Sequence, residues 1–404
     1  MRRRTVNRLM GVKPRVAIVT PGSYPIPSGK SSSVENVVKN IGALVGKRVS
    51  LWVLGKKTPA LPAAEVRNGV RYVRPARSKK RPTYISAVSA SIARLRPHII
   101  QVENRPASVL AFKRRHPRRE VWLSLHSTTF LSPSRIRPLT LRKALVRADC
   151  IIVNSYFLKD YVAKRFPRAA KKIRVNYLGV DTSQFISRWS PQGEMMRMGL
   201  LSALGYEQKK ILLYVGRLIE KKGVHYLLQA MPAIIERHPD TLLVIVGSAD
   251  YGVNPITPYV RTLHELGNGM PQHVRFIQYV PHDQVHRWFC LADVAVVPSF
   301  AEEAFGLVNV EAMASGVPVI ATRAGGMKEL IVDGETGFLI SQYAVAAAIA
   351  EKANQLLDNP ELTRQMGEAS IRRVSEHFTW DHAARRMADW YYQSAARRNR
   401  NYKR

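Results

Sequence analysis

Short apolar segments alternate with longer amphipathic segments along this chain of 404 residues, and the alternation starts a second time near residue 210. The apolar segments have the length of buried strands, and the amphipathic segments have the apolar spacing of helices that cover a sheet. Strands and helices in this order favour a parallel sheet with helices on both faces. We therefore predict two successive doubly wound α/β domains, because 404 residues exceed what one ordinary hydrophobic core organises.

The predicted elements divide the chain into two similar halves. The strands of the first half span residues 16–20, 49–54, 98–102, 121–126 and 149–155, with a helix at 34–45. Those of the second half span residues 210–216, 241–247, 274–280, 293–299 and 318–322, with helices at 224–238, 283–290, after 305 and at 345–357. The predicted domains cover residues 1–190 and 200–378, joined by a linker within 188–208. Residues 379–404 predict a C-terminal helix with a basic tail.

The positive charge belongs almost entirely to the first domain. Residues 1–180 contain 39 Lys and Arg against six acidic residues, which is +33 of the net charge of +34. A field of this size concentrates anions at one surface. The partners that it favours are an anionic acceptor, an anionic polymer or an acidic membrane surface, with nucleic acid the least favoured. A solvated basic face without a partner is the alternative.

Composition excludes several other classes of protein. No apolar run approaches the roughly 20 residues that cross a bilayer, and the basic N-terminus lacks the apolar core of a signal peptide, so a cytoplasmic protein is predicted. Cys150 and Cys290 lie in apolar stretches and are predicted to be reduced core cysteines. The sequence contains no DxD, HExxH or CxxC motif, so we predict no metal site and no cofactor. The oligomeric state is not indicated.

The segment EAFGLVNVE carries the strongest functional signal. Phe305 and Gly306 fit a turn into a helix whose first amides, around Leu307, face a ligand and form an anion site for a diphosphate. Glu311 lies about one turn further on the same face, where its carboxylate can accept ribose hydroxyls. Glu303 precedes the helix and can accept sugar hydroxyls. The alternative is a pair of unrelated surface glutamates.

Two further segments follow predicted strands of the second domain. Arg217 and Lys222, in GRLIEKKG, stand just beyond a strand end, where they can neutralise a diphosphate and stabilise its developing charge. A solvated basic loop is the alternative. Gly325 and Gly326 follow the strand at 318–322 and serve either close approach of a ligand or a tight turn.

In the first domain, His126 ends a predicted strand and can orient or polarise substrate groups. A structural histidine is the alternative. The loop after the first strand contains Gly29, Lys30 and Ser31 and ends in GKS, like a phosphate-binding loop. Because Gly22 and Gly29 are separated by six residues instead of four, the motif does not match that of nucleotide triphosphatases. We predict instead an acceptor or phosphate loop over the site.

Taken together, these segments resemble the retaining GT-B glycosyltransferases of family 4. EAFGLVNVE resembles the E-x7-E signature of the family, GRLIEKKG its phosphate loop, and ASGVPVIATRAGGMKELIVDGETGFLI and HFTWDHAARRMADWY its C-terminal stretches. PIPSGKSSSVE and QVENRP look most like spore-coat-associated members from endospore-forming bacteria. The resemblance covers residues 15–392. It implies two Rossmann-like domains facing a central cleft, with a C-terminal helix crossing back to the first domain.

The resemblance also implies roles for individual residues. Arg217 and Lys222 would bind the donor diphosphate, and amides near Gly306 and Leu307 would bind its distal phosphate. Glu303 would bind the donor sugar, and His126 would lie near that reacting sugar. Glu311 would bind the ribose, and the backbone from Ile277 to Val280 would bind the base. The implied reaction retains the anomeric configuration, needs no metal, and has the leaving phosphate help to take the acceptor's proton.

Four residues depart from the family pattern. Ser31 and Ser32 replace a Gly-Gly pair, Ser127 follows His126 where many relatives have Asp, and Leu178 replaces an Asn. These departures bear on the acceptor and the sugar more than on the fold.

We therefore predict a hexosyltransferase that uses a nucleotide-diphosphate sugar, UDP-linked by default, and an anionic, envelope or spore-surface acceptor. Peripheral attachment to the inner membrane or to the spore coat stays open. The alternatives are a coat or envelope assembly protein that binds polyanions, and a sugar-nucleotide epimerase, which shares the fold.

Overall fold

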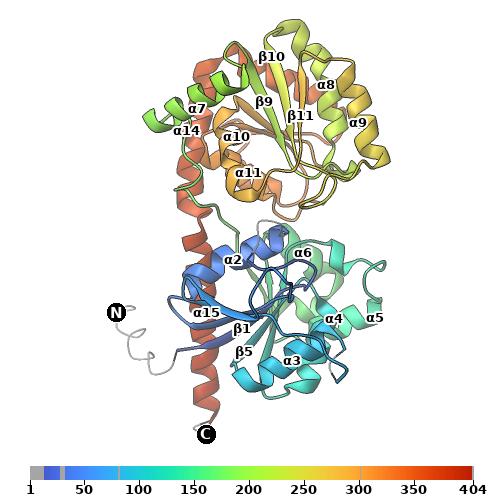
Figure 1. The fold of residues 1–404 in the computed structure, drawn as a ribbon, viewed down its shortest axis with the longest axis vertical. Helices are drawn as coiled ribbons and strands as arrows, with labels where there is room; N and C mark the ends of the chain where they lie inside the picture. The colour runs from blue at the N-terminus through green and yellow to red at the C-terminus, as the bar shows by residue number, and fades with distance from the viewer. Residues whose placement is uncertain (1–12, 28–31, 81, 301, 403–404) are drawn as a thin grey trace. The chain divides into compact units, whose positions relative to one another are not determined.

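The computed structural model describes residues 13–27, 32–80, 82–300 and 302–402. Two compact units are present (Figure 1). Unit 1 comprises residues 1–177 together with 380–404, and unit 2 comprises residues 178–379. Each unit contains one sheet with helices packed against it, which confirms the two predicted doubly wound α/β domains.

Unit 1 is built on an eight-stranded sheet in the order β3-β4-β2-β1-β5-β6-β7-β8. All neighbouring strands are parallel except the hairpin of β3 and β4. The strands are β1 (Arg15–Val19), β2 (Ser50–Leu54), β3 (Ala64–Arg67), β4 (Val70–Val73), β5 (Ile99–Glu103), β6 (Glu120–Leu125), β7 (Cys150–Val153) and β8 (Ile173–Val175). The strand order reverses between β1 and β5, which is where sheets of this kind place ligands.

The helices of unit 1 connect these strands as the alternation predicts. They are α2 (Ser33–Val45), α3 (Tyr84–Leu95), α4 (Pro106–Arg115), α5 (Pro138–Arg147) and α6 (Tyr156–Arg165), with short 3₁₀ turns η1 (Thr129–Leu131) and η2 (Pro167–Lys172). Helix α4 packs against both α3 and α5, so these helices form one layer of the unit.

The C-terminal helix α15 (Trp380–Tyr402) belongs to unit 1, as the sequence predicts. Its buried residues recur every three to four positions, so one stripe of the helix faces the unit. These residues are Trp380, Ala383, Ala384, Met387, Ala388, Tyr391 and Ser394. The stripe packs against α2, and the ring of Tyr391 lies 5.2 Å from that of Trp122.

Unit 2 is built on a six-stranded parallel sheet in the order β11-β10-β9-β12-β13-β14. The strands are β9 (Lys210–Val215), β10 (Thr241–Val246), β11 (Val274–Ile277), β12 (Val294–Val297), β13 (Val319–Thr322) and β14 (Gly337–Ile340). The strand order reverses between β9 and β12. The loops that follow these two strands are therefore the expected ligand-binding loops.

The helices of unit 2 cover both faces of this sheet (Figure 1). They are α7 (Pro191–Leu204), α8 (Val224–Arg237), α9 (Pro258–Asn268), α10 (His286–Leu291), α11 (Leu307–Ala314), α12 (Met327–Leu330), α13 (Val345–Asp358) and α14 (Pro360–His377), with 3₁₀ turns η3 (Glu220–Lys222) and η4 (His282–Gln284). None of the helices in the described part of the chain is long and apolar enough to cross a membrane.

The segment predicted as a linker is an integral part of unit 2. Ser190 caps helix α7 by accepting a hydrogen bond from the amide of Gly193, and Gly205 ends the helix in a left-handed conformation. The domain boundary therefore lies at residue 178, twelve residues before the predicted end of the first domain. The helix was not predicted, because only Gly193 and Leu201 in it are buried and the sequence therefore has no regular apolar spacing there.

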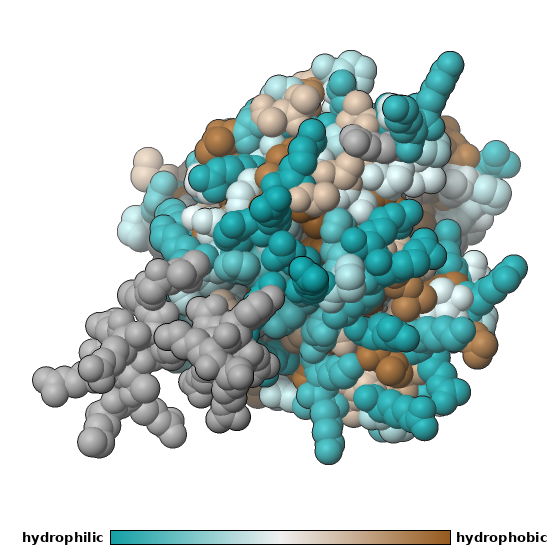
Figure 2. Space-filling view, turned by 90° about the horizontal axis from the view of Figure 1, so that it is seen from below, coloured by the Kyte–Doolittle hydropathy of each residue, from teal (hydrophilic) through white to brown (hydrophobic). Residues whose placement is uncertain are grey.

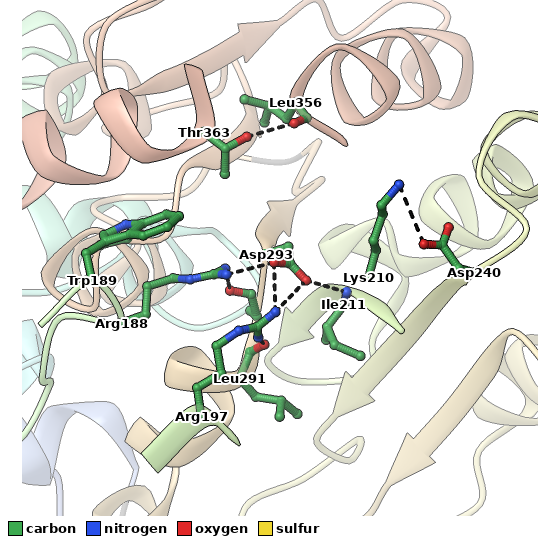
Figure 3. A network of polar contacts seen from close by, with 12 residues as sticks. Arg188, Trp189, Arg197, Lys210, Ile211, Asp240, Leu291, Asp293, Leu356 and Thr363 are labelled. Atoms are coloured by element: carbon green, nitrogen blue, oxygen red, sulfur yellow. Dashed lines mark hydrogen bonds and ion pairs between the residues drawn. The ribbon is translucent and has the colours of Figure 1, made fainter. Parts of the chain in front are cut away.

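Asp293 attaches this segment to the sheet of unit 2 (Figure 3). Its carboxylate accepts hydrogen bonds from Arg188 at 2.7 Å, from Arg197 at 2.9 and 3.1 Å, and from the amide of Ile211 at 2.7 Å. Burial raises the pKa of the Asp293 carboxyl, but the two guanidinium groups outweigh burial and hold the pKa below its usual range. Charge pairing thus places residues 188–197 in unit 2.

Candidate functional site

In unit 2, the predicted site residues gather at the carboxyl-terminal edge of the sheet. Arg217 and Lys222 follow β9, Ile277 ends β11, and Glu303 follows β12. Since the strands are parallel, their carboxyl ends lie at one edge, so residues from distant parts of the sequence become neighbours there.

Lys222 and Glu303 are in direct contact, with the lysine Nζ donating to Oε2 of the carboxylate. Desolvation raises the pKa of the Glu303 carboxyl, but Lys222 outweighs it, with smaller contributions from Lys221 and Arg217, so the pKa lies below its usual range. Glu303 is therefore an ionised acceptor, and Lys222 is a cation held at the same place. The structure brings together two residues that the sequence assigned to sugar and diphosphate.

Gly325 and Gly326 hold the loop that carries Glu303. The amide of Gly326 donates to the carbonyl oxygen of Glu303 at 2.8 Å. A Cβ atom at Gly325, which has a φ of +55°, would lie 2.0 Å from that same oxygen. The pair also lies in a turn, in which the amide of Met327 donates to the carbonyl oxygen of Ala324 at 3.2 Å. Of the two roles left open for this glycine pair, the structure shows the tight turn, and close approach of a ligand stays a prediction.

Helix α11 begins beside this loop. Gly306 is its N-cap in a left-handed conformation with a φ of +89°, and no side chain caps the helix there. The first amides and the positive end of the helix dipole are therefore suited to an anion. Phe305 is 2% exposed, and its ring packs 6.2 Å from that of Phe378, so its side chain belongs to the core.

Glu311 lies one turn into α11, and its carboxylate meets a partner that the sequence did not indicate. Oε1 of Glu311 lies 2.9 Å from Nε2 of His282 in η4. His282 comes two residues after Val280, at the end of the segment predicted to hold a base. The sequence did not predict this contact, because His282 lies 29 residues before Glu311 and belongs to no motif.

The remaining donor residues lie on neighbouring loops. The carbonyl oxygen of Arg217 accepts from the Tyr214 hydroxyl at 2.9 Å, and its guanidinium lies 5.4 Å from the ring centre of Tyr251. The carbonyl oxygen of Ile277 accepts from the amide of Gly247 at 3.0 Å. A second contact fixes the same segment, because the amide of Tyr279 donates to Asn254 at 3.0 Å.

In unit 1, His126 follows strand β6 and is held by polar groups from the adjacent strands. Its Nε2 lies 2.7 Å from Oε2 of Glu103, which ends β5, and 3.1 Å from the hydroxyl of Ser124. Its amide donates to the side chain of Asn104 at 2.8 Å, and its carbonyl accepts from Asn154 at 3.2 Å. The sequence singled out His126 but not Glu103, although both end strands that are neighbours in the sheet.

Two predictions concern residues or groups that the geometry above does not cover. The acceptor or phosphate loop of Gly29, Lys30 and Ser31 lies outside the described residues. Among the residues that are described, no three His, Cys, Asp or Glu side chains are grouped so as to hold a metal ion. The absence of a metal requirement stays a prediction.

Two family descriptions match the chain, one in each half. Residues 202–373 match "Glycosyl transferases group 1", and residues 33–184 match "Glycosyltransferase Family 4". The chain is 33% identical to spore coat protein SA of Bacillus subtilis (strain 168) over 377 residues, which cover 93% of this chain and 99% of that protein.

Solved structures with the same fold cover nearly the whole chain. HepE from Anabaena, crystallised in complex with UDP-glucose, superimposes with a TM-score of 0.74 and 23% identity over 93% of this chain and 98% of HepE. Sucrose-phosphate synthase from Thermosynechococcus elongatus gives a TM-score of 0.77 and 23% identity over 95% of this chain and 99% of that chain.

Proposed function

Because the chain belongs to the family 4, group 1 glycosyltransferases and has their GT-B fold, we propose that it moves a hexose from a nucleotide-diphosphate sugar, UDP-linked, to an anionic acceptor with retention of configuration and without a metal. The observation that carries this proposal is the contact of Lys222 with Glu303 beside the uncapped start of α11. The cation of Lys222, the carboxylate of Glu303 and the first amides of α11 thus lie together.

Each group at this edge has a distinct part in the proposed reaction. The donor diphosphate takes Lys222 and Arg217 as its counter-charges, and the amides at Leu307 bind its distal phosphate. Glu303, released from Lys222, accepts hydroxyls of the sugar, and Glu311 accepts those of the ribose. As the sugar–phosphate bond breaks, the two cations and the helix dipole stabilise the charge on the leaving phosphate.

The acceptor side of the proposal rests on the charge of unit 1. Helices α4 and α5 contain six basic residues and no acidic residue. On α5, Arg142, Lys143 and Arg147 are exposed, and Leu139 among them is 60% exposed. We name this surface, formed by α4 and α5, the α4–α5 face. A basic helix with single exposed apolar residues suits an anionic lipid or glycolipid surface.

The end of unit 1 at which α15 finishes is also hydrophilic (Figure 2). Hydrophilic residues cover most of this view, and the apolar residues form only small groups among them. No broad apolar patch interrupts the described part of this face, so charge rather than apolar contact would attract a partner.

A second candidate function is assembly of a coat or envelope through polyanion binding, with the enzyme activity reduced. The name of the relative from Bacillus subtilis, a spore coat protein, and the charge of unit 1 favour it. Both matching families are described as glycosyltransferases, so neither supports the sugar-nucleotide epimerase that the sequence left open.

The proposal is tested first by nucleotide binding. UDP should raise the melting temperature of the full-length protein, and Glu311→Ala should remove most of this shift, because the ribose loses its acceptor. Glu236→Ala, an exposed glutamate on α8, is the matched control and should keep the full shift. If UDP, GDP and ADP all leave the melting temperature unchanged, the proposed donor site in unit 2 is contradicted.

The donor itself is identified by hydrolysis. UDP-glucose, UDP-galactose, GDP-mannose and ADP-glucose are incubated separately with the protein, and released nucleotide is measured. The proposal expects release from one UDP-sugar that requires Lys222 and persists in EDTA. Isomerised sugar nucleotide without release would point to an epimerase, and no turnover of any donor would favour the assembly function.

A further inference from the structure

A series of hydrogen bonds inside unit 1 runs from helix α15 to the ring of His126. The hydroxyl of Tyr391 donates to Oε1 of Gln101 at 2.6 Å. Nε2 of Gln101 donates to Oε1 of Glu103 at 2.7 Å. The other carboxylate oxygen of Glu103 lies 2.7 Å from Nε2 of His126. The C-terminal helix is thus joined to a residue that ends strand β6.

The residues of this series are buried, and the chemistry of each group decides which atom donates in each hydrogen bond. Tyr391 is 0% exposed, Glu103 1% and Gln101 3%. A buried carboxylate has to be satisfied by donors. Since Tyr391 donates to the carbonyl group of Gln101, the amide N–H of Gln101 is directed to Glu103. The remaining carboxylate oxygen can only accept, so Nε2 of His126 carries a proton.

The other ring nitrogen of His126 has a different environment. Nδ1 is buried and has no hydrogen-bond partner among the described residues. The backbone of His126 is fixed on both sides by Asn104 and Asn154, so the ring is held at a fixed place. In the neutral ring with its proton on Nε2, Nδ1 presents a lone pair.

We propose that Glu103, Gln101 and Tyr391 are positioning residues that hold His126 as the Nε2–H tautomer, so that Nδ1 accepts a hydrogen bond from a substrate hydroxyl. The proposal rests on the proposed function and on the position near the reacting sugar that the family resemblance implies for His126. Helix α15, at the end of the sequence, thereby takes part in setting the site of unit 1, because hydrogen bonds in such a series reinforce one another.

The tautomer is measured without any ligand. The 15N chemical shifts of the histidine rings are recorded for the full-length protein, and the His126 signals are assigned by their loss in His126→Asn. We expect the Nε2–H form in the wild type. Glu103→Gln should move the proton toward Nδ1, since its new amide takes the N–H of Gln101 on its oxygen and presents its own N–H to Nε2. Glu120→Gln, whose carboxylate instead accepts from the indole of Trp122 at 2.8 Å, should leave the form unchanged.

Kinetics test whether the tautomer matters to the reaction. With UDP-glucose, or the donor that hydrolysis selects, Glu103→Gln should lower kcat roughly 10- to 100-fold, the size of effect seen when a metal-ligating histidine loses the partner that orients it. KM should stay nearly unchanged, and Glu103→Asp should restore part of kcat. A merely structural role would instead lower the melting temperature and leave kcat per folded molecule intact.

Tyr391→Phe provides a second test if Glu103→Gln does not fold, because the phenyl ring keeps its packing on Trp122. It should lower kcat by about threefold to tenfold, the loss of one hydrogen bond. Tyr392→Phe, whose hydroxyl donates to the backbone of Arg48 at 2.8 Å, is the control and should have no effect on kcat. An Nδ1–H form in the wild type, or equal kcat values for these two variants, would overturn the proposal. A protein that binds no nucleotide would contradict the proposed function while the tautomer result still stands.

Discussion

The two units share one architecture and differ in almost everything that their side chains do. Unit 1 carries 46 Lys and Arg against eight acidic residues, a net charge of +38, whereas unit 2 carries 17 against 21, a net charge of −4. Both sheets reverse their strand order once and present loops at their carboxyl ends. The fold therefore does not set the charge, and the proposed division of tasks between the two units rests on this difference.

The charges of the two units are also arranged differently. In unit 2 they are paired at defined places, as in Lys222 with Glu303 and Asp293 with two arginines. On the α4–α5 face of unit 1, Lys113 pairs with Asp149, whereas the other five basic residues of α4 and α5 form no ion pair with the described residues. Paired charges favour one small ligand that replaces a partner, whereas an unpaired field favours an extended anionic surface.

The largest expected effect is a loss of stability that is confined to unit 2. Asp293→Asn should lower the free energy of unfolding of unit 2 by about 3–5 kcal/mol, because Arg188 and Arg197 stay buried without their carboxylate. Hydrogen exchange measured by mass spectrometry should show faster exchange in unit 2 peptides than in unit 1 peptides. Asp358→Asn, which breaks a more exposed pair with Arg237, should change stability by less than about 1 kcal/mol. Equal destabilisation of both units would show that they unfold as one.

The second effect separates them by activity. Lys222→Met should lower the rate of UDP release from the donor by roughly 10²- to 10³-fold, because the leaving phosphate loses a counter-charge. Binding to anionic vesicles should be unchanged, since unit 1 is intact. Lys210→Met serves as the control, because Lys210 begins β9 at the opposite edge of the sheet and contacts Asp240 at 3.5 Å (Figure 3). A comparable loss with Lys210→Met would place the effect outside the site.

The third effect removes charge from unit 1 alone. Arg142→Gln combined with Lys143→Gln should weaken binding to vesicles that contain acidic lipids by roughly 30-fold, at about 1 kcal/mol for each basic residue. Binding should also weaken as salt rises. The UDP-induced shift in melting temperature should persist. Arg261→Gln with Arg287→Gln removes two exposed charges from unit 2, and an equal loss of vesicle binding there would contradict the α4–α5 face as the docking surface.

The smallest effect is a pH dependence in unit 2. Because the pKa of Glu303 is lowered in the fold, its pairing with Lys222 contributes stability above the ordinary carboxyl pKa of about 4.3. This contribution is lost as the pH falls through the lower folded value. The wild type should exceed Glu303→Gln in stability by less than about 1 kcal/mol at pH 6, and the difference should vanish in acid. Urea unfolding at several pH values measures this difference in stability, with Glu236→Gln as the control variant. A difference between the wild type and Glu303→Gln that grows in acid would contradict the lowered pKa of Glu303.

Several features could be predicted because they depend on chain order alone. A short apolar run followed by an amphipathic run identifies a strand and its helix, and the residue that follows the strand must lie at the carboxyl edge. Lys222, Glu303 and His126 were found in this way, and the structure places Lys222 and Glu303 beyond the carboxyl ends of strands in unit 2 and His126 beyond such an end in unit 1. The charge difference between the halves is likewise a property of the sequence itself.

Other features were decided only by the tertiary structure. The partner of His126 lies 23 residues away, that of Glu311 29 residues away, and the residue that requires Gly325 is Glu303. Arg188 joins unit 2 through Asp293, 105 residues further on, which moved the domain boundary. Such contacts depend on which strands become neighbours, and the same local pattern fits many strand orders. The sequence therefore determined the type of each element and the edge on which its polar residue stands, whereas the strand order chose which of those residues meet.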